Sequence, residues 1–405
     1  MHKLIVQPLK ESDISTVIII DALDECRDEE PASAILSVLG QFVSEIPKVK
    51  LLVTGRPELR IQEGFCLPLL AEMTSVFVLH EVEPNQVDND IQLFFGHKFS
   101  EIARRRRGLD GWPTREQLDI LYKRAAGLFV YAVATVKFVD KSSGNPRNQL
   151  NLLLQSPESS VREGRTKLNA NTTLNSLYTT ILQGAFGDED DPDNDPKVRS
   201  VLGAMILVAN PLSPSTIAAL LDLDTEDVIP ILSSIQSLLI LQEDINCPVQ
   251  PFHKSFPDFI TNPDRCTNRR FLIFPGNYHP QLLVDCLRLM DRTLEKNMCR
   301  LPEAVANSDV SDVKERIERY ISTALQYACR WWHTHLVDQH IPSINTHKIT
   351  SALHRFLERK FLFWLEVLSV LGAVRNAAEA LRATVGWLEV GKGLTPHVSP
   401  EFSQT

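Results

Sequence analysis

Three carboxylates come just after an apolar run near the start of the chain: Asp21, Asp24 and Glu25 follow the β-branched residues 17–20. A continuous apolar run without alternation predicts a strand that is buried on both faces, as in a parallel sheet. Ligands of open α/β sheets bind beyond the carboxyl ends of the strands, where Asp21 would lie. A carboxylate there can hold Mg²⁺ beside the phosphates of a nucleotide, and a later acid can orient the attacking water. The pattern predicts a nucleotide site, although the same carboxylates could simply cap the following helix.

A second apolar run ends in an arginine. Residues 49–54 predict another buried strand, and Gly55-Arg56-Pro57 follows it. A guanidinium at the end of that strand can reach a terminal phosphate and report whether it is present. Because the carboxyl ends of parallel strands meet at one edge of a sheet, we expect Arg56 and Asp21 to lie on the same edge. The alternative is a surface arginine in a proline turn.

A histidine far along the chain is the third candidate. His253 lies within the segment 252–260, directly after an expected strand. A lone histidine in such a place is more often a structural residue than a ligand-binding one. The residues by themselves leave both interpretations of His253 open.

The phosphate-binding loop that should accompany these residues is missing from the sequence. No G-x-x-x-x-G-K-[ST] occurs anywhere in the 405 residues. Such a loop supplies the backbone N–H groups and the lysine that bind the β- and γ-phosphates. Without it we expect weak or no nucleotide binding and no useful ATPase activity. The strand before that loop would be central to the sheet, so its loss would leave open apolar edges. We expect the chain to be the middle of a longer protein.

The elements around these residues predict an α/β region followed by helices. Residues 31–46 carry an apolar helix stripe between the two strands, and residues 76–79 predict a third strand. Strand, helix and strand with short connections form a βαβ unit and imply a parallel sheet. Further helices are expected at 86–107, 114–140 and 172–186.

A winged helix is expected in the middle of the chain, because three short helices followed by a strand pair form that pattern. The expected helices and strands are 197–209, 214–221, 225–238, 239–243 and 249–253. The acidic run 188–196 before them predicts a solvated loop. The last part is almost wholly helical, with helices expected at 278–298, 311–338, 346–370 and 372–390.

Composition and charge argue against several classes of partner. The net charge of −9 disfavours nucleic acid or an anionic membrane as the main partner. The run Arg104-Arg105-Arg106-Arg107 is short and lacks interleaved aromatic residues, which favours a solvated helix face. No apolar stretch reaches about 18 residues, which predicts no membrane span. The seven cysteines form no C-x-x-C, which indicates reduced thiols and a cytoplasmic setting.

Three stretches resemble the NACHT class of signal-transduction nucleotidases, and specifically the fungal nephrocystin-like members related to NOD-like receptors. They are 17–26 (Val-Ile-Ile-Ile-Asp-Ala-Leu-Asp-Glu-Cys), 51–58 (Leu-Leu-Val-Thr-Gly-Arg-Pro-Glu) and 252–260 (Phe-His-Lys-Ser-Phe-Pro-Asp-Phe-Ile). The resemblance implies an α/β plus α fold, with a partial parallel P-loop sheet, a helical lid, a winged helix and a C-terminal helical domain. The implied boundaries are 1–84 for the C-terminal half of the nucleotide-binding domain, 85–187 for the lid, 197–262 for the winged helix and 276–390 for the last domain.

The resemblance also implies a role for each candidate residue. Asp21 matches the Mg²⁺-binding acid, and Asp24 and Glu25 match the hydrolytic acids. Arg56 matches the sensor of the γ-phosphate. His253 matches the winged-helix histidine that contacts the ADP β-phosphate and keeps the resting state closed. The implied cofactors are ATP or ADP with Mg²⁺.

These implications lead to one expected function and one alternative. The first is a regulatory NTPase module of a fungal signalling, innate-immunity or self-recognition receptor, which opens and self-associates when ATP replaces ADP. Its partners would be proteins or further copies of itself, with neither nucleic acid nor membrane. The alternative is a non-enzymatic protein-interaction scaffold or decoy fragment. Winged-helix DNA binding is a third, weaker hypothesis, because residues 225–238 contain Glu226 and Asp227 and no Lys or Arg.

Overall fold

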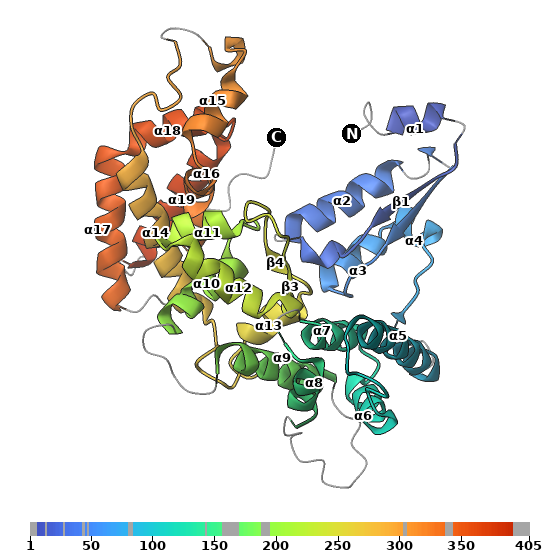
Figure 1. Cartoon of the computed structure of the whole chain (residues 1–405). Helices are drawn as coiled ribbons and strands as arrows, with labels where there is room; N and C mark the ends of the chain where they lie inside the picture. The colour runs from blue at the N-terminus through green and yellow to red at the C-terminus, as the bar shows by residue number, and fades with distance from the viewer. Residues whose placement is uncertain are drawn as a thin grey trace. The chain divides into compact units, whose positions relative to one another are not determined.

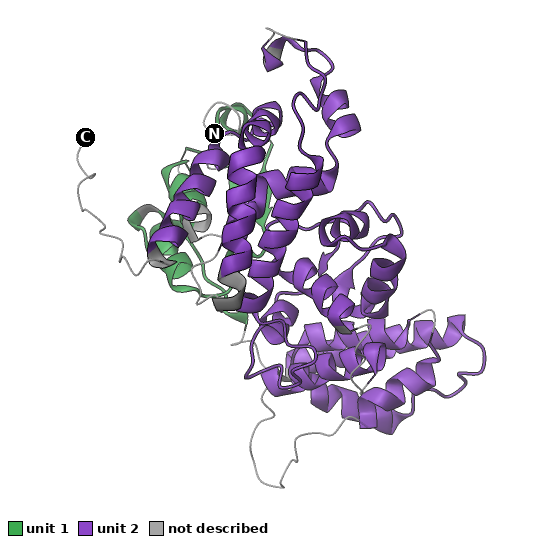
Figure 2. Cartoon of the chain, turned by 90° about the vertical axis from the view of Figure 1, so that its left-hand side faces the viewer, with its two compact units in different colours: residues 1–83 green, residues 84–405 purple. Residues whose placement is uncertain are grey.

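The computed structural model divides the chain into two compact units, residues 1–83 and 84–405 (Figure 2). The structure describes residues 6–12, 14–26, 29–42, 45–46, 48–79, 84–141, 144–155, 170–187, 195–302, 306–336 and 343–391. The expected acidic loop at 188–196 lies almost entirely outside these residues.

Residues 1–83 hold a two-stranded parallel sheet with a helical crossover (Figure 1). β1 (Thr16–Ile20) pairs with β2 (Val49–Val53), and α2 (Glu29–Phe42) connects them, so the predicted βαβ unit is present. The apolar stripe of α2 contributes Leu36 to a small core that includes Leu23 and Ile61. Further helices here are α1 (Gln7–Glu11), the 3-10 helix η2 (Leu23–Glu25), α3 (Leu59–Phe65) and α4 (Pro68–Met73).

The third strand predicted at 76–79 is wrong. Residues 74–78 adopt no regular secondary structure, and the described part of this sheet contains β1 and β2 only. Val76, Phe77 and Leu79 are 75%, 76% and 76% exposed. An apolar run becomes a strand only when a neighbouring strand takes up its N–H and C=O groups. The run has the composition of a strand, but among the described residues no strand pairs with it.

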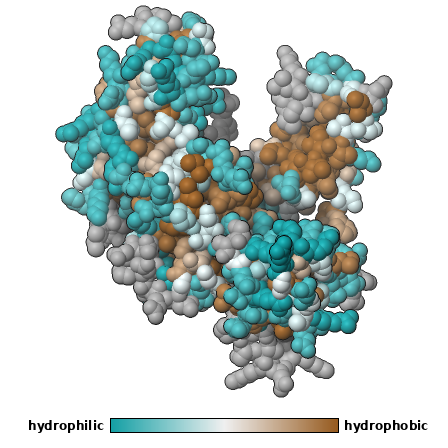
Figure 3. All heavy atoms as spheres, viewed as in Figure 1, coloured by the Kyte–Doolittle hydropathy of each residue, from teal (hydrophilic) through white to brown (hydrophobic). Residues whose placement is uncertain are grey.

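One face of the two-stranded sheet carries exposed apolar side chains. Val17, Ile19 and Leu52 are 62%, 64% and 53% exposed, while the alternate residues of both strands are at least partly buried. Ile19 lies beside Leu52 in the register, so these side chains form one patch. The hydrophobic area over these strands is visible at the upper right of Figure 3. Burial on both faces was predicted for these strands. Within the described part of residues 1–83, the structure shows burial on one face and exposed side chains on the other.

The first helices of residues 84–405 form a bundle. They are α5 (Pro84–Arg105), α6 (Arg115–Ala125), α7 (Phe129–Val139), α8 (Pro146–Gln155) and α9 (Ala170–Phe186). The single helix expected at 114–140 is two helices. Ala126 and Gly127 have φ values of 46° and 76°, a left-handed conformation that ends a helix and that glycine adopts readily.

Three short helices and a strand pair follow, as expected from the pattern. They are α10 (Asp195–Leu207), α11 (Pro214–Leu221), α12 (Thr225–Ser234), the antiparallel β3 (Leu239–Ile240) and β4 (Gln250–Pro251), and then α13 (Ser255–Ile260). The strands are two residues long, shorter than the sequence pattern predicted.

The last part of the chain is helical. Its helices are α14 (Pro275–Thr293), α15 (Val313–Tyr320), α16 (Thr323–Trp331), α17 (Ser343–Arg359), α18 (Phe361–Val370) and α19 (Arg375–Gly391). The expected helix 311–338 is interrupted at Ser322, whose side chain accepts a hydrogen bond from the Leu325 N–H and caps α16. The α/β plus α class is therefore confirmed. Among the described residues, no helix has the length and apolar character needed to cross a membrane.

Candidate functional site

The parallel ladder places the two predicted strand ends at one edge of the sheet. Ile20 lies beside Val53 at the end of β1 and β2. Two backbone hydrogen bonds continue the pairing: the Thr54 N–H donates to the Ile20 carbonyl at 2.9 Å, and the Leu23 N–H donates to the Thr54 carbonyl at 2.9 Å. Asp21 and Arg56 therefore follow their strands at the same edge.

Thr54 connects the two strand ends through its side chain. Its hydroxyl oxygen accepts a hydrogen bond from the Ala22 N–H at 2.9 Å and donates to the Asp21 carboxylate. Ala22 has a φ of 53°, so the chain turns sharply after β1, and Asp21 is left exposed to solvent. Sequence reasoning did not single out Thr54. The available signal was a hydroxyl residue at the end of the second strand, beside the position expected for the Mg²⁺-binding acid.

Asp24 and Arg56 form a second connection across the same edge. The backbone N–H of Arg56 donates to Asp24 Oδ1 at 3.1 Å, and Arg56 Nε lies 3.6 Å from Asp24 Oδ2. The Asp24 side chain is 5% exposed, and the Arg56 side chain is 44% exposed. Asp24 therefore ties the turn after β1 to the turn after β2. Glu25, one residue later, is exposed.

The metal-binding capacity of this edge is limited. Within the described ranges there is no group of three or more His, Cys, Asp or Glu side chains that could hold a metal ion. Mg²⁺ is commonly held by one or two carboxylates together with waters and the phosphates of its substrate. The Asp21 carboxylate and the Thr54 hydroxyl are oxygen ligands of the right kind, and a nucleotide would have to supply further ligands.

His253 belongs to residues 84–405 and follows β4. Its ring Nδ1 accepts a hydrogen bond from the Ser255 N–H at 3.1 Å and lies 2.7 Å from the Ser255 hydroxyl. The residue is exposed. The structure thus brings Asp21, Asp24 and Arg56 together within residues 1–83. His253 belongs to the other unit, residues 84–405.

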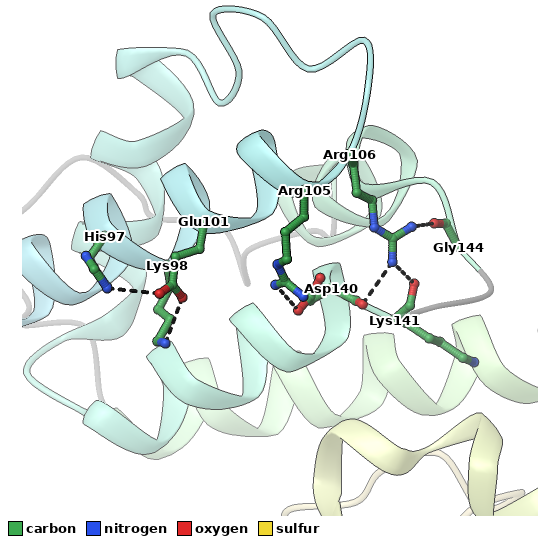
Figure 4. A network of polar contacts seen from close by, with 8 residues as sticks. All are labelled: His97, Lys98, Glu101, Arg105, Arg106, Asp140, Lys141 and Gly144. Carbon is green, nitrogen blue, oxygen red and sulfur yellow. Dashed lines mark hydrogen bonds and ion pairs between the residues drawn. The ribbon is translucent and has the colours of Figure 1, made fainter.

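The arginine run at the end of α5 contacts the turn after α7 (Figure 4). Arg105 forms an ion pair with Asp140 at 2.8 Å, whereas Arg106 donates to the carbonyl oxygens of Asp140, Lys141 and Gly144 at 3.1, 2.9 and 2.9 Å. The prediction of a solvated face is right for exposed Arg105 but incomplete for Arg106, which satisfies carbonyl groups at the end of a helix.

Figure 4 also shows a smaller set of charges one turn earlier on α5. Lys98 Nζ donates to Glu101 at 2.8 Å, and His97 Nε2 lies 3.1 Å from the same carboxylate. The hydrogen bond from Lys98 lowers the pKa of Glu101. These contacts lie on the surface of α5, where such pairs three and four residues apart stabilise a helix slightly.

Comparison with known proteins gives two matches. The family model described as nephrocystin 3, N-terminal, matches residues 1–56, the segment that carries β1, β2 and the strand-end residues. The vegetative incompatibility protein HET-E-1 of Podospora anserina is 24% identical over 389 residues, which cover 91% of this chain and 26% of that protein. The chain therefore spans about a quarter of the length of this relative. No solved structure matches significantly.

The parallel α/β unit with acids at its strand ends, followed by helices, is the arrangement that the resemblance to the NACHT class implies. Both matches support that class, and they confirm the resemblance to fungal nephrocystin-like NACHT proteins seen in the three sequence stretches. The particular relative with the longer match is HET-E-1, a vegetative incompatibility protein of Podospora anserina.

Proposed function

We propose that this chain is a nucleotide-responsive regulatory module of the NACHT/STAND type within a fungal signalling or self-recognition receptor. The observation that carries the proposal is the strand-end geometry. Two parallel strands present Asp21 and Arg56 at one edge, and Thr54 and Asp24 connect the two turns. This edge is where nucleotides bind in open α/β sheets.

The proposed roles follow from what each side chain contacts. Asp21, exposed and hydrogen-bonded to Thr54, is the Mg²⁺ ligand. Glu25 is the exposed acid that can act on the attacking water. Arg56 is the γ-phosphate sensor. Asp24 is buried against Arg56, so its role is to hold the arginine in place and not to act on the attacking water.

The helical parts are assigned by the same proposal. Residues 85–187 form the lid, residues 197–262 the winged helix and residues 276–390 the C-terminal helical domain. Three short helices followed by the β3–β4 pair support the winged helix. ADP would favour a closed state through His253, and ATP an open, self-associating state, because a nucleotide shifts an equilibrium only through its different contacts in two states.

Nucleotide affinity is expected to be low for these 405 residues. The sequence has no G-x-x-x-x-G-K-[ST], and without that loop the main phosphate contacts are missing. We therefore propose a site that responds weakly to Mg²⁺-ADP or Mg²⁺-ATP and has no useful ATPase activity. The partners are other proteins or further copies of the chain, in the cytoplasm.

Calorimetric titration of the 405-residue chain with ADP, with and without Mg²⁺, tests the proposal. We expect weak binding that Mg²⁺ strengthens, and we expect Asp21→Ala to remove the Mg²⁺ effect. Asp110→Ala is the matched control, since Asp110 is an exposed aspartate between α5 and α6. Binding that is equal with and without Mg²⁺, or unchanged in Asp21→Ala, would refute the assigned metal role.

A protein-interaction scaffold is the second candidate, and the apolar face of the sheet favours it. Val17, Ile19 and Leu52 form an exposed patch on one unit, and such patches often mark protein-binding surfaces. This function needs no nucleotide. Partner binding that survives Asp21→Ala but fails in Ile19→Lys would favour the scaffold over the nucleotide switch.

DNA binding through the winged helix is disfavoured. α12 (Thr225–Ser234) has Glu226 and Asp227 in its first turn and no basic residue in its last turn. A helix that enters the major groove usually carries basic side chains that contact phosphates. The winged helix is therefore proposed to pack against other domains.

A further inference from the structure

The segment that carries His253 is held between two helices of the same unit. Phe252 lies under Lys137 of α7, whose Nζ is 3.9 Å from the ring centroid. On the other side of His253, the Ser255 hydroxyl is 2.7 Å from the hydroxyl of Tyr178 on α9. The loop between β4 and α13 is thus attached to both α7 and α9.

The hydrogen bonds at the imidazole determine where its proton lies. The Ser255 backbone N–H donates to Nδ1 at 3.1 Å, and an amide N–H can only donate. Nδ1 must therefore be the acceptor, so the neutral ring carries its proton on Nε2. The Ser255 hydroxyl, 2.7 Å from the same unprotonated nitrogen, is then also a donor to it.

The direction of the next hydrogen bond follows. A serine hydroxyl has one proton, and Ser255 gives it to His253, so Tyr178 must donate to the Ser255 oxygen. Tyr178 is 1% exposed, and burial raises its pKa to about 12, which keeps the phenol protonated near neutral pH. Two hydroxyls in sequence therefore donate toward the imidazole: Tyr178 donates to Ser255, and Ser255 donates to His253.

Tyr178 is rigidly placed. Its ring packs against Phe256 and Phe259 of α13 with centroids 5.4 Å apart in each case. Arg265 donates to the Asn175 side-chain carbonyl at 3.1 Å, which fixes α9 one turn before Tyr178. Tyr178 is a buried, well-packed donor, and through Ser255 it can fix the orientation of the exposed His253 ring.

We propose that Tyr178 and Ser255 are positioning residues that set the Nε2–H tautomer and the orientation of His253, so that this imidazole donates to a phosphate oxygen of a bound nucleotide. The phosphate part of the proposal rests on the proposed function of His253. The tautomer and orientation rest only on the contacts within residues 84–405. The lid helix α9 and the histidine of the winged helix are then coupled through a single hydroxyl.

The tautomer is measured by long-range ¹H–¹⁵N NMR of the 405-residue chain labelled at histidine nitrogen. His253→Gln assigns the signals of this residue among the 11 histidines. We expect an acceptor-type Nδ1 and a protonated Nε2 above pH 7.5 in the wild type. Tyr178→Phe, which keeps the packed ring, and Ser255→Ala both keep the Ser255 N–H donor but weaken or remove hydroxyl donation toward Nδ1. Each should therefore raise the fraction of His253 that is protonated on Nδ1 above the wild-type value, with Nε2–H still the major form. Ser255→Thr, which keeps the hydroxyl, should restore the wild-type spectrum.

Titration of the same variants with Mg²⁺-ADP tests the phosphate contact. Loss of one positioning hydrogen bond should weaken binding by about two- to tenfold in Tyr178→Phe and Ser255→Ala. Tyr122→Phe is the matched control, because Tyr122 is a partly buried tyrosine on α6. It should change neither the tautomer nor the affinity.

The outcomes separate the two claims. An unchanged tautomer in both Tyr178→Phe and Ser255→Ala would overturn the positioning role, whatever the nucleotide does. A tautomer that shifts as expected, in a wild-type chain that shows no ADP binding at millimolar concentration, would overturn the proposed function and the phosphate contact with it. A shifted tautomer together with weakened ADP binding would support both.

Discussion

Replacing Asp24 by alanine should loosen the strand ends of residues 1–83 much more than replacing Asp21. Asp24 accepts the Arg56 N–H at 3.1 Å and faces Arg56 Nε at 3.6 Å, and its side chain is buried. Asp21 is exposed and contacts the Thr54 hydroxyl, where water can replace it. The two acids stand three positions apart and were expected to act together, yet they differ in burial.

The size of the effect comes from the contacts that are lost. A hydrogen bond to a charged group contributes about 1.5–3 kcal/mol, and Asp24→Ala removes the one that the Arg56 N–H makes. The ion pair itself adds little, since the Arg56 side chain is 44% exposed and water screens it. We therefore expect Asp24→Ala to destabilise the strand ends by about 1.5–3 kcal/mol, which is about a 10- to 150-fold change in local opening.

Hydrogen exchange measured by mass spectrometry suits this prediction because it reports local opening without requiring two-state unfolding of a two-unit chain. Peptides that cover β1 and β2 should exchange about 10- to 150-fold faster in Asp24→Ala than in the wild type. Peptides from residues 84–405 serve as an internal control. Asp24→Asn keeps an acceptor for the Arg56 N–H and loses the charge, so its effect should be much smaller.

Two results would refute this reasoning. Equal exchange of β1 and β2 in Asp24→Ala and the wild type would show that Asp24 does not hold the strand ends. An effect of Asp21→Ala as large as that of Asp24→Ala would show that burial does not distinguish the two acids.

Three further predictions concern stability, pH and surface properties. The buried hydroxyl of Tyr327 accepts a hydrogen bond from the Ala209 N–H at 2.9 Å and contacts His335 Nε2 at 2.8 Å. Because Tyr327→Phe removes both contacts, it should lower the free energy of unfolding, measured by urea titration, by about 2–4 kcal/mol. Burial raises the pKa of Asp285 to about 6, above the value of about 3.9 in an unfolded chain. Its contribution to stability is complete below about pH 4 and is lost as the pH rises through the folded-state pKa. Asp285→Asn should therefore lose less stability than the wild type between about pH 4 and pH 7 in urea unfolding, and an equal loss would contradict the assignment. Ile19→Thr should reduce binding of the dye ANS, because Ile19 is 64% exposed on the uncovered face of the sheet; undiminished fluorescence would place the dye elsewhere.

Local patterns predicted the regular elements well. The two apolar runs form β1 and β2, and the helix stripe between them makes the pair parallel. These predictions succeed because strand burial and helix periodicity depend on residues close in sequence. The same reasoning placed Asp21 and Arg56 on one edge, since parallel strands connected by a helix end on the same side.

Helix ends were predicted less well. The long helices expected at 114–140 and 311–338 are each divided, the first at Ala126 and Gly127 and the second at Ser322. The apolar periodicity of each segment does not by itself show where one helix ends and the next begins. The glycine and the capping serine were visible in the sequence, and they were outweighed by the periodicity.

The sequence by itself determined the order of the elements, the parallel strand pair and the types of residue available at its edge. Tertiary structure alone decided that the run 76–79 remains unpaired, that Asp24 is buried while Asp21 is exposed, and that Tyr178 meets Ser255 across 77 positions. The reason is physical. A strand needs a neighbour for its backbone groups, burial depends on what packs above a side chain, and a hydrogen bond needs two partners at a fixed distance. None of these is a property of a single stretch of sequence.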